Sequence, residues 1–193
     1  MSLSPFRRVT TIQKTAAGSV LLAIGLGVGH LTAMAQTRSG PAKAPAEPIV
    51  TVAARQVGVR RCLPAISAIA QRATTGATIQ DVIIDWDRQV PDAAPFFSMT
   101  GLGNGTQRAA LTIAAIPTTG GCAVLVERIS ASNLTCPQIA ASELPGFRSG
   151  ELIDGITVYQ NPQSASETYT LITNASGCLI VRRQASMKWP PTQ

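Results

Sequence analysis

Acidic side chains that could do chemistry gather around Trp86, as Asp81, Asp85, Asp87 and Asp92. Two carboxylates at a fixed separation can act as the acid and the nucleophile or base of a hydrolase. Oxygen ligands of this kind also bind divalent metals, but the segment lacks the spacing of a calcium loop. The alternative is a solvated strand end with Asp85 paired to Arg88. A hydrolase using Asp81, Asp85 and Asp87 is therefore kept as an alternative, and no metal is expected.

Histidine and lysine, the usual catalytic bases, are scarce. The one histidine, His30, lies in the N-terminal apolar segment, and beyond that segment the lysines are Lys43 and Lys188. A Ser-His-Asp or Cys-His site needs an imidazole, and a Schiff base needs a lysine in the folded core. We therefore expect a protein that is not an enzyme and that carries no cofactor.

The N-terminus has the order of an export signal. Arg7, Arg8 and Lys14 precede an uncharged apolar run over residues 16–31, and Ala33-Met34-Ala35 follows. This pattern predicts a signal peptide over residues 1–35, cleaved after Ala35. The alternative is an uncleaved membrane anchor, since the run is nearly long enough to span a bilayer. A lipid anchor is not expected, because no cysteine directly follows the apolar run at the expected cleavage site.

The remaining chain divides by composition. Residues 36–49 are rich in Pro and Ala, which predicts a disordered linker. Residues 50–188 are long enough for one domain with a single core, and residues 189–193 form a tail. Three of the 16 basic residues lie in the signal, which leaves 13 basic residues against 10 acidic ones. This small excess gives no reason to expect a nucleic-acid partner.

The four cysteines lie in the predicted domain at Cys62, Cys122, Cys136 and Cys178. An even number of cysteines in an exported chain predicts disulfides, here two. Four cysteines allow three pairings, and the count alone does not choose among them. No Cys-x-x-C motif is present, which argues against a redox site.

The settings of the cysteines repeat. Cys62 and Cys136 each precede a proline and open a predicted helix, the second one capped by Asn133 or Thr135. Cys122 and Cys178 each follow a glycine and enter a β-branched run. The pattern is consistent with a duplicated α-β-β-β unit, although few positions match. If the duplication is real, the simplest pairing joins Cys62 to Cys122 and Cys136 to Cys178.

Short apolar runs between turn signals predict strands. They cover residues 96–100, 108–116, 155–160 and 168–173, together with the two runs that begin at Cys122 and Cys178. Residues 78–86 fit either a helix or a strand, and their β-branched run favours a strand. We expect Trp86, Phe96 and Phe97 to be core anchors. The predicted fold is α+β, an antiparallel sheet of about six strands with two helices on one face and two disulfides.

These features favour a non-catalytic binding or accessory protein of the bacterial envelope, in the periplasm or secreted, with another envelope protein as its partner. The alternative within this class is an inhibitor or immunity protein against an exported hydrolase. It would use a rigid loop such as residues 87–95 or 101–106. Possible binding residues are Trp86, Asp85 and Asp87, together with Arg60 and Arg61, which could face an anionic partner.

Overall fold

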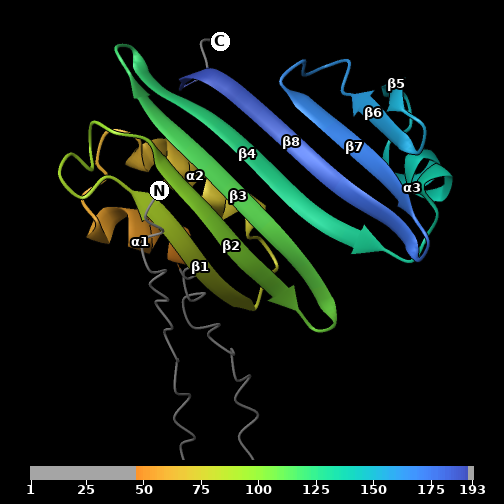
Figure 1. The fold of residues 1–193 in the computed structure, drawn as a ribbon, viewed down its shortest axis with the longest axis horizontal. Helices are drawn as coiled ribbons and strands as arrows, with labels where there is room; N and C mark the ends of the chain where they lie inside the picture. Colours follow the sequence, from red (N-terminus) through yellow and green to blue (C-terminus); the bar gives the residue numbers. More distant parts are fainter. Residues whose placement is uncertain (1–46, 191–193) are drawn as a thin grey trace, which may run out of the picture. The chain divides into compact units, whose positions relative to one another are not determined.

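A computed structural model describes residues 47–190, which form an antiparallel sheet with three helices (Figure 1). The elements in chain order are α1 (Ile49–Gln56), α2 (Leu63–Ala73), β1 (Ile79–Trp86), β2 (Phe96–Asn104), β3 (Gln107–Thr118), β4 (Gly121–Ser132), α3 (Cys136–Glu143), β5 (Arg148–Ile153), β6 (Ile156–Gln160), β7 (Glu167–Asn174) and β8 (Gly177–Trp189). The strands form one eight-stranded sheet in the order β1-β2-β3-β4-β8-β7-β6-β5.

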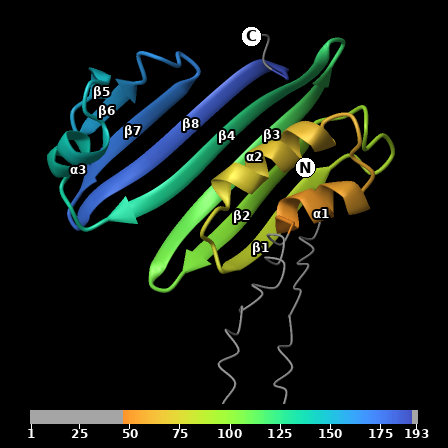
Figure 2. The ribbon, with the colours of Figure 1, turned by 180° about the vertical axis from the view of Figure 1, so that it is seen from behind.

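The helices pack on one face of the sheet, as the strand register shows. The residues Leu102, Ala109, Ser130, Ile180 and Leu171 are cross-strand partners in turn from β2 to β7, so their side chains share a face. Leu102 and Ala109 belong to the core under α1 and α2, whereas Leu171 and Ile180 belong to the core under α3. Figure 2 shows α1 and α2 in front of this side of the sheet. The described residues place no helix on the opposite face.

Two disulfides tie helices to strands on this side. Cys62, just before α2, is bonded to Cys122 at the start of β4, with Cα atoms 5.5 Å apart. Cys136, the first residue of α3, is bonded to Cys178 at the start of β8, with Cα atoms 5.0 Å apart. The predicted disulfides are thus present, in the pairing that the duplication favours. Two disulfides indicate an oxidising compartment.

The sheet consists of two similar halves that meet at its centre. Each half is a helix followed by four strands, with a disulfide from the helix start to the fourth strand. The fourth strands, β4 and β8, pair with each other in antiparallel register. An approximate dyad therefore passes between them. Cys122 and Cys178 occupy equivalent positions, so Glu127 and Arg183, each five residues further on, are equivalent as well and face each other at the dyad.

The helix starts follow the sequence signals. Thr135 caps α3: its hydroxyl accepts the backbone N–H of Gln138, while the Gln138 side chain accepts the backbone N–H of Thr135. This reciprocal pair is a capping box, which satisfies two N–H groups that a helix start otherwise leaves free. A proline also follows Cys62 and Cys136 at the first turn of α2 and α3. Of the two candidates for the α3 cap, Thr135 is the correct one.

The α+β class is confirmed, but the predicted details were partly wrong. Within residues 47–190 the sheet has eight strands rather than about six, the helices number three rather than two, and each half contributes four strands rather than three. The missed strand is β5, in which every residue is exposed, so it has no buried alternation to detect. The missed helix is α1, whose Ile49, Val50 and Val52 are β-branched and disfavoured in helices.

The predicted signal and most of the predicted linker lie outside the described residues. Among residues 47–190, no helix is long and apolar enough to cross a membrane.

Candidate binding face

The face of the sheet opposite the helices, called the open face below, is unusually apolar. A solvated sheet face is usually polar, because strands alternate apolar and polar residues. Here the register places apolar side chains from all eight strands on the open face. The larger ones are Ile79, Ile83, Phe97, Met99, Ile116, Leu125, Ile129, Ile153, Ile156, Val158, Ile172, Leu179 and Val181.

Strand β2 shows how this face arises. Phe96, Ser98, Thr100 and Leu102 are buried toward the helices. Phe97 and Met99 point the other way and keep 48% and 50% of their surface exposed. The prediction that Phe97 is a core anchor is therefore wrong, whereas Phe96 is fully buried. Hydrophobic residues on both faces of one strand are typical of strands that are covered on both sides.

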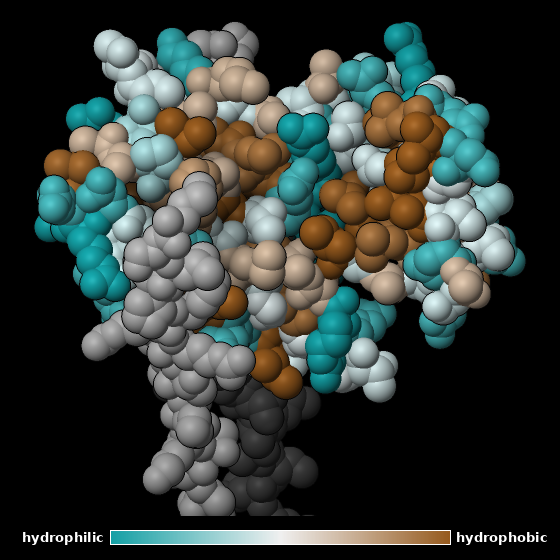
Figure 3. Space-filling view, viewed as in Figure 1, coloured by the Kyte–Doolittle hydropathy of each residue, from teal (hydrophilic) through white to brown (hydrophobic). Residues whose placement is uncertain are grey.

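The open face is large enough for a protein partner. Eight strands spaced about 4.8 Å apart and roughly six residues long make a surface of about 700 Å². A stable protein interface buries about 800 Å² on each partner. In Figure 3, apolar side chains gather in two areas of this face, with polar side chains between them. Single exposed apolar residues need no explanation, but two clusters of them on one uncovered sheet face do.

The polar centre of the open face is an ion pair on the dyad. Arg183 Nε lies 3.6 Å from Glu127 Oε1. Both side chains are partly exposed, at 53% and 33%, so the pair contributes little to stability. Charged groups in protein interfaces generally affect specificity and the rate of association more than affinity.

The predicted carboxylate cluster is divided by the structure. Asp81 and Asp85 lie on the open face of β1, four residues apart and therefore about 13 Å apart. Paired carboxylates in glycosidases stand about 5 to 10 Å apart. Asp87 Oδ1 instead accepts the backbone N–H groups of Gln89 at 2.8 Å and Val90 at 3.2 Å. No group of acids, cysteines or histidines in the described part of the chain is arranged to hold a metal ion.

Trp86 and its neighbours have structural roles. Trp86 is half-buried and packs against the core under α1 and α2, on the helix side of β1. The guanidinium of Arg88 lies 5.5 Å from the centre of the Trp86 ring. Within residues 47–190 the ion pairs are Arg55–Glu47, Arg182–Glu167 and Arg183–Glu127, so the expected pair between Asp85 and Arg88 does not form.

Asp92 joins the loop of residues 87–95 to the start of α2. Its Oδ1 accepts the backbone N–H of Arg60 at 2.7 Å and of Arg61 at 2.6 Å. These two backbone hydrogen bonds hold the pKa of the Asp92 carboxyl below its usual value. The loop also packs against Gly58, where a Cβ would lie 3.2 Å from Pro91 Cγ. Both ends of this loop are thus fixed, while Val90 at its tip stays 50% exposed.

The predicted binding residues therefore do not form one site. Asp85 lies on the open face, Trp86 on the helix side, and Asp87 in a turn of its own loop. Arg60 and Arg61 are exposed next to Asp92, and Arg61 lines a shallow hollow with Thr118 and Thr119. The sequence reading missed the open face itself. Its signal is the presence of apolar residues at both odd and even positions of one strand, as with Phe96 and Phe97.

Comparison of the chain with protein-family models, with curated proteins and with solved structures gives no significant match. The function therefore has to be argued from the geometry alone.

Proposed function

We propose that this is an exported, non-catalytic protein of the bacterial cell envelope that binds another envelope protein through the open face. The signal-like N-terminus and the two disulfides support export to an oxidising compartment such as the periplasm. The absence of histidine after residue 30 supports a role in binding rather than in catalysis.

The observation that carries the proposal is the exposed apolar area on the open face. Phe97 is central to it, because its register partners Asp85 and Ala114 leave its ring uncovered. An aromatic side chain offers roughly 150 to 250 Å², so burying the exposed half of Phe97 removes about 100 Å² from water. At about 25 cal/mol per Å² this contributes about 2 kcal/mol to binding.

The test is capture of the partner by cross-linking in the native host. The full-length tagged protein should recover one envelope protein in near-stoichiometric amount. Phe97→Glu should reduce that recovery at least tenfold, since it loses about 2 kcal/mol of apolar burial and adds a charge to desolvate. Leu134→Glu, which alters a 49% exposed residue in the connection between β4 and α3 and outside the sheet, is the matched control and should leave recovery unchanged.

Light scattering on the purified protein completes the test. A monomer is expected. A dimer that Phe97→Glu dissociates would show that a second copy covers the open face, and would overturn the proposal of a different partner.

The fixed loop of residues 87–95 favours a second candidate, an inhibitor or immunity protein against an exported hydrolase. Inhibitors present a rigid exposed loop whose conformation changes little on binding. Asp92 and Asp87 hold this loop through four hydrogen bonds to backbone N–H groups. Val90→Glu distinguishes the two candidates: loss of the partner with Val90→Glu but not with Phe97→Glu would favour the loop. A carboxylate hydrolase finds no support in the spacing of Asp81 and Asp85.

A further inference from the structure

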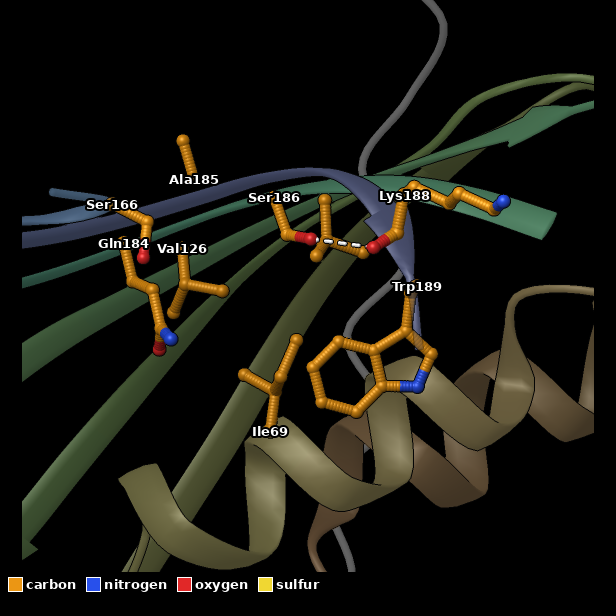
Figure 4. A pocket seen from close by; sticks show the side chains of 9 residues that line it. Ile69, Val126, Ser166, Gln184, Ala185, Ser186, Lys188 and Trp189 are labelled. Atoms are coloured by element: carbon orange, nitrogen blue, oxygen red, sulfur yellow. Dashed lines mark hydrogen bonds between the residues drawn. The ribbon is translucent and has the colours of Figure 1, made fainter. Parts of the chain in front are cut away.

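A pocket lies at the seam between the two halves, on the helix side and therefore opposite the open face. It has a volume of about 310 Å³ and lies between α2, β4, β8 and the loop before β7 (Figure 4). This volume is at the lower end of the range for small-molecule sites. The residues that define it are Ile69, Val124, Val126, Ser166, Gln184 and Trp189.

One end of the seam pocket is apolar. Val124 and Val126 form its floor and are only 6% and 8% exposed, and Ile69 of α2 forms one side. Figure 4 shows the Trp189 indole above α2, beside Ile69 and facing the same space. Arg72 lies 5.8 Å from the centre of that indole. This end offers a hydrocarbon chain apolar contacts from Ile69, Val126 and Trp189, and the nearby Ser186 hydroxyl already donates to the Lys188 carbonyl.

The other end of the seam is basic. Val126 pairs with Gln184, and two residues further along the same face Arg128 pairs with Arg182. Residues two apart on a strand are about 7 Å apart, so Arg128 begins about 7 Å beyond Val126. Like charges directly opposite each other in a sheet repel. Glu167 pairs with Arg182 and offsets part of that repulsion, which leaves Arg128 as the group that a bound anion would contact.

The two arginines differ in what they already bind. Arg182 donates from Nε to Glu167 Oε1 at 2.7 Å, and its guanidinium lies 5.5 Å from the centre of the Tyr169 ring. Arg128 is exposed and has no acidic partner within residues 47–190. Lys188 does not compete for an anion in the pocket, because its side chain extends away from Ile69 and toward Gly120 (Figure 4). One guanidinium is therefore available at the basic end.

We propose that the seam pocket binds a small amphiphile with a single carboxylate, such as a free medium-chain fatty acid. Its hydrocarbon chain lies against Ile69, Val126 and Trp189, and its carboxylate receives hydrogen bonds from Arg128. A guanidinium and a carboxylate carry opposite charges and can form a bidentate pair of hydrogen bonds. Gln184, whose amide points into the pocket in Figure 4, lies between the two ends and can donate to the same carboxylate. This site is separate from the proposed protein-binding face.

Trp189 provides the readout. The chain has two tryptophans, so in a Trp86→Phe background the emission reports Trp189 alone. Titration with decanoate should shift that emission saturably. Adding Arg128→Gln should weaken decanoate binding at least tenfold, since it removes a charge-assisted hydrogen bond. Arg148→Gln, a matched change of an exposed arginine at the distant edge strand β5, should have no effect.

Decanol tests the head group, and the open face tests specificity. Decanol should bind more weakly than decanoate and be insensitive to Arg128→Gln. Phe97→Glu should leave decanoate binding unchanged, even though it is expected to reduce partner recovery at least tenfold. Calorimetry on the wild-type protein and Arg128→Gln gives the same comparison without removing Trp86. Equal decanoate affinities of these two proteins, or an emission that does not saturate, would overturn the proposal.

Discussion

Gly121 and Gly177 occupy equivalent positions in the two halves, where the central strands β4 and β8 begin. Replacing either glycine by alanine should lower the free energy of unfolding, both because a Cβ would overlap backbone atoms and because the φ angle is unfavourable for a residue with a side chain. Gly121 and Gly177 are the first residues of β4 and β8 and have φ values of 136° and 142°. A Cβ on Gly177 would overlap the carbonyl oxygen of Ser132 and lie 3.0 Å from Asn133 Cα. A Cβ on Gly121 would overlap the carbonyl oxygen of Trp189. Each glycine thus allows one central strand to begin against the end of the other.

The cost of Gly177→Ala follows from these two contributions. A residue with a side chain in this backbone region costs about 1 to 3 kcal/mol. The overlapping atoms belong to the backbone and cannot rotate away, so relieving the overlap costs about 1 to 3 kcal/mol more. We expect Gly177→Ala, and likewise Gly121→Ala, to lower the free energy of unfolding by about 2 to 6 kcal/mol. That is a large part of the 5 to 15 kcal/mol typical of a domain.

Two other glycines serve as matched controls. Gly105, in the turn between β2 and β3, has a φ of 55° but no atom within 4 Å of its Cβ position, so Gly105→Ala should cost only about 1 to 2 kcal/mol. Gly150 has neither an unusual φ nor a neighbour, so Gly150→Ala should be neutral or slightly stabilising.

Urea unfolding of the oxidised proteins, followed by circular dichroism, gives the four free energies. From the most to the least stable, the expected order is Gly150→Ala, Gly105→Ala, and then Gly121→Ala and Gly177→Ala together. If Gly177→Ala were within about 1 kcal/mol of Gly150→Ala, the close approach of β8 to Ser132 and the reasoning from it would be refuted.

Three further changes test other parts of the fold by urea unfolding. Each disulfide closes a loop, of 60 residues for Cys62–Cys122 and 42 for Cys136–Cys178, so replacing either pair by alanine should cost about 4 kcal/mol, nearly equally; a loss below about 1 kcal/mol would contradict this. The hydroxyls of Thr51 and Thr100 are buried without a hydrogen-bond partner, so Thr51→Val and Thr100→Val should each stabilise by about 1 kcal/mol, and a clear loss would reveal a missed partner. The lowered pKa of Asp92 means that its charge stabilises the fold above the unfolded-state pKa of about 4, and that this contribution disappears as the pH falls through the lower folded-state value. The advantage of the wild type over Asp92→Asn should therefore be present at pH 6 and shrink toward pH 3, staying below about 1 kcal/mol because the group is exposed; a difference independent of pH would exclude this origin.

The disulfide framework was predictable because it depends on local signals that occur twice. A cysteine before a helix proline and a cysteine after a glycine identify the two ends of each half. Strand β1 was also predictable in type, since its β-branched run outweighed a helical spacing. By contrast, α1 forms because Val50, Ala53 and Ala54 are buried against α2 and the sheet, a tertiary effect that overrides local preference.

The open face could not be found from alternation, because alternation identifies only one buried face. In β2 both parities are apolar, so the pattern reads as a strand buried on two sides. Only the position of the helices shows which side is left uncovered. The carboxylates around Trp86 do not form one site for a related reason: neighbouring residues in a strand point to opposite faces of the sheet. Asp85 faces outward and Trp86 faces the helices, while Asp87 has already turned into the loop.

The dyad accounts for the opposite charges of Glu127 and Arg183, which face each other across the central strands β4 and β8. Equivalent residues of the two halves face each other there, so two identical charged residues would repel at the dyad. The chain has Glu127 at one position and Arg183 at the other, and the two form an ion pair on the open face.

On the helix side the equivalent positions also carry different residues. Val126 corresponds to Arg182, and Gln184 corresponds to Arg128, each counted from its own cysteine. Because one half contributes the valine and the other an arginine, the seam is apolar over one half and basic over the other. An amphiphile could not be bound in one orientation by two identical halves, because both ends of their seam would be alike. The divergence at the seam therefore gives this sheet a directional pocket that its symmetric backbone alone does not provide.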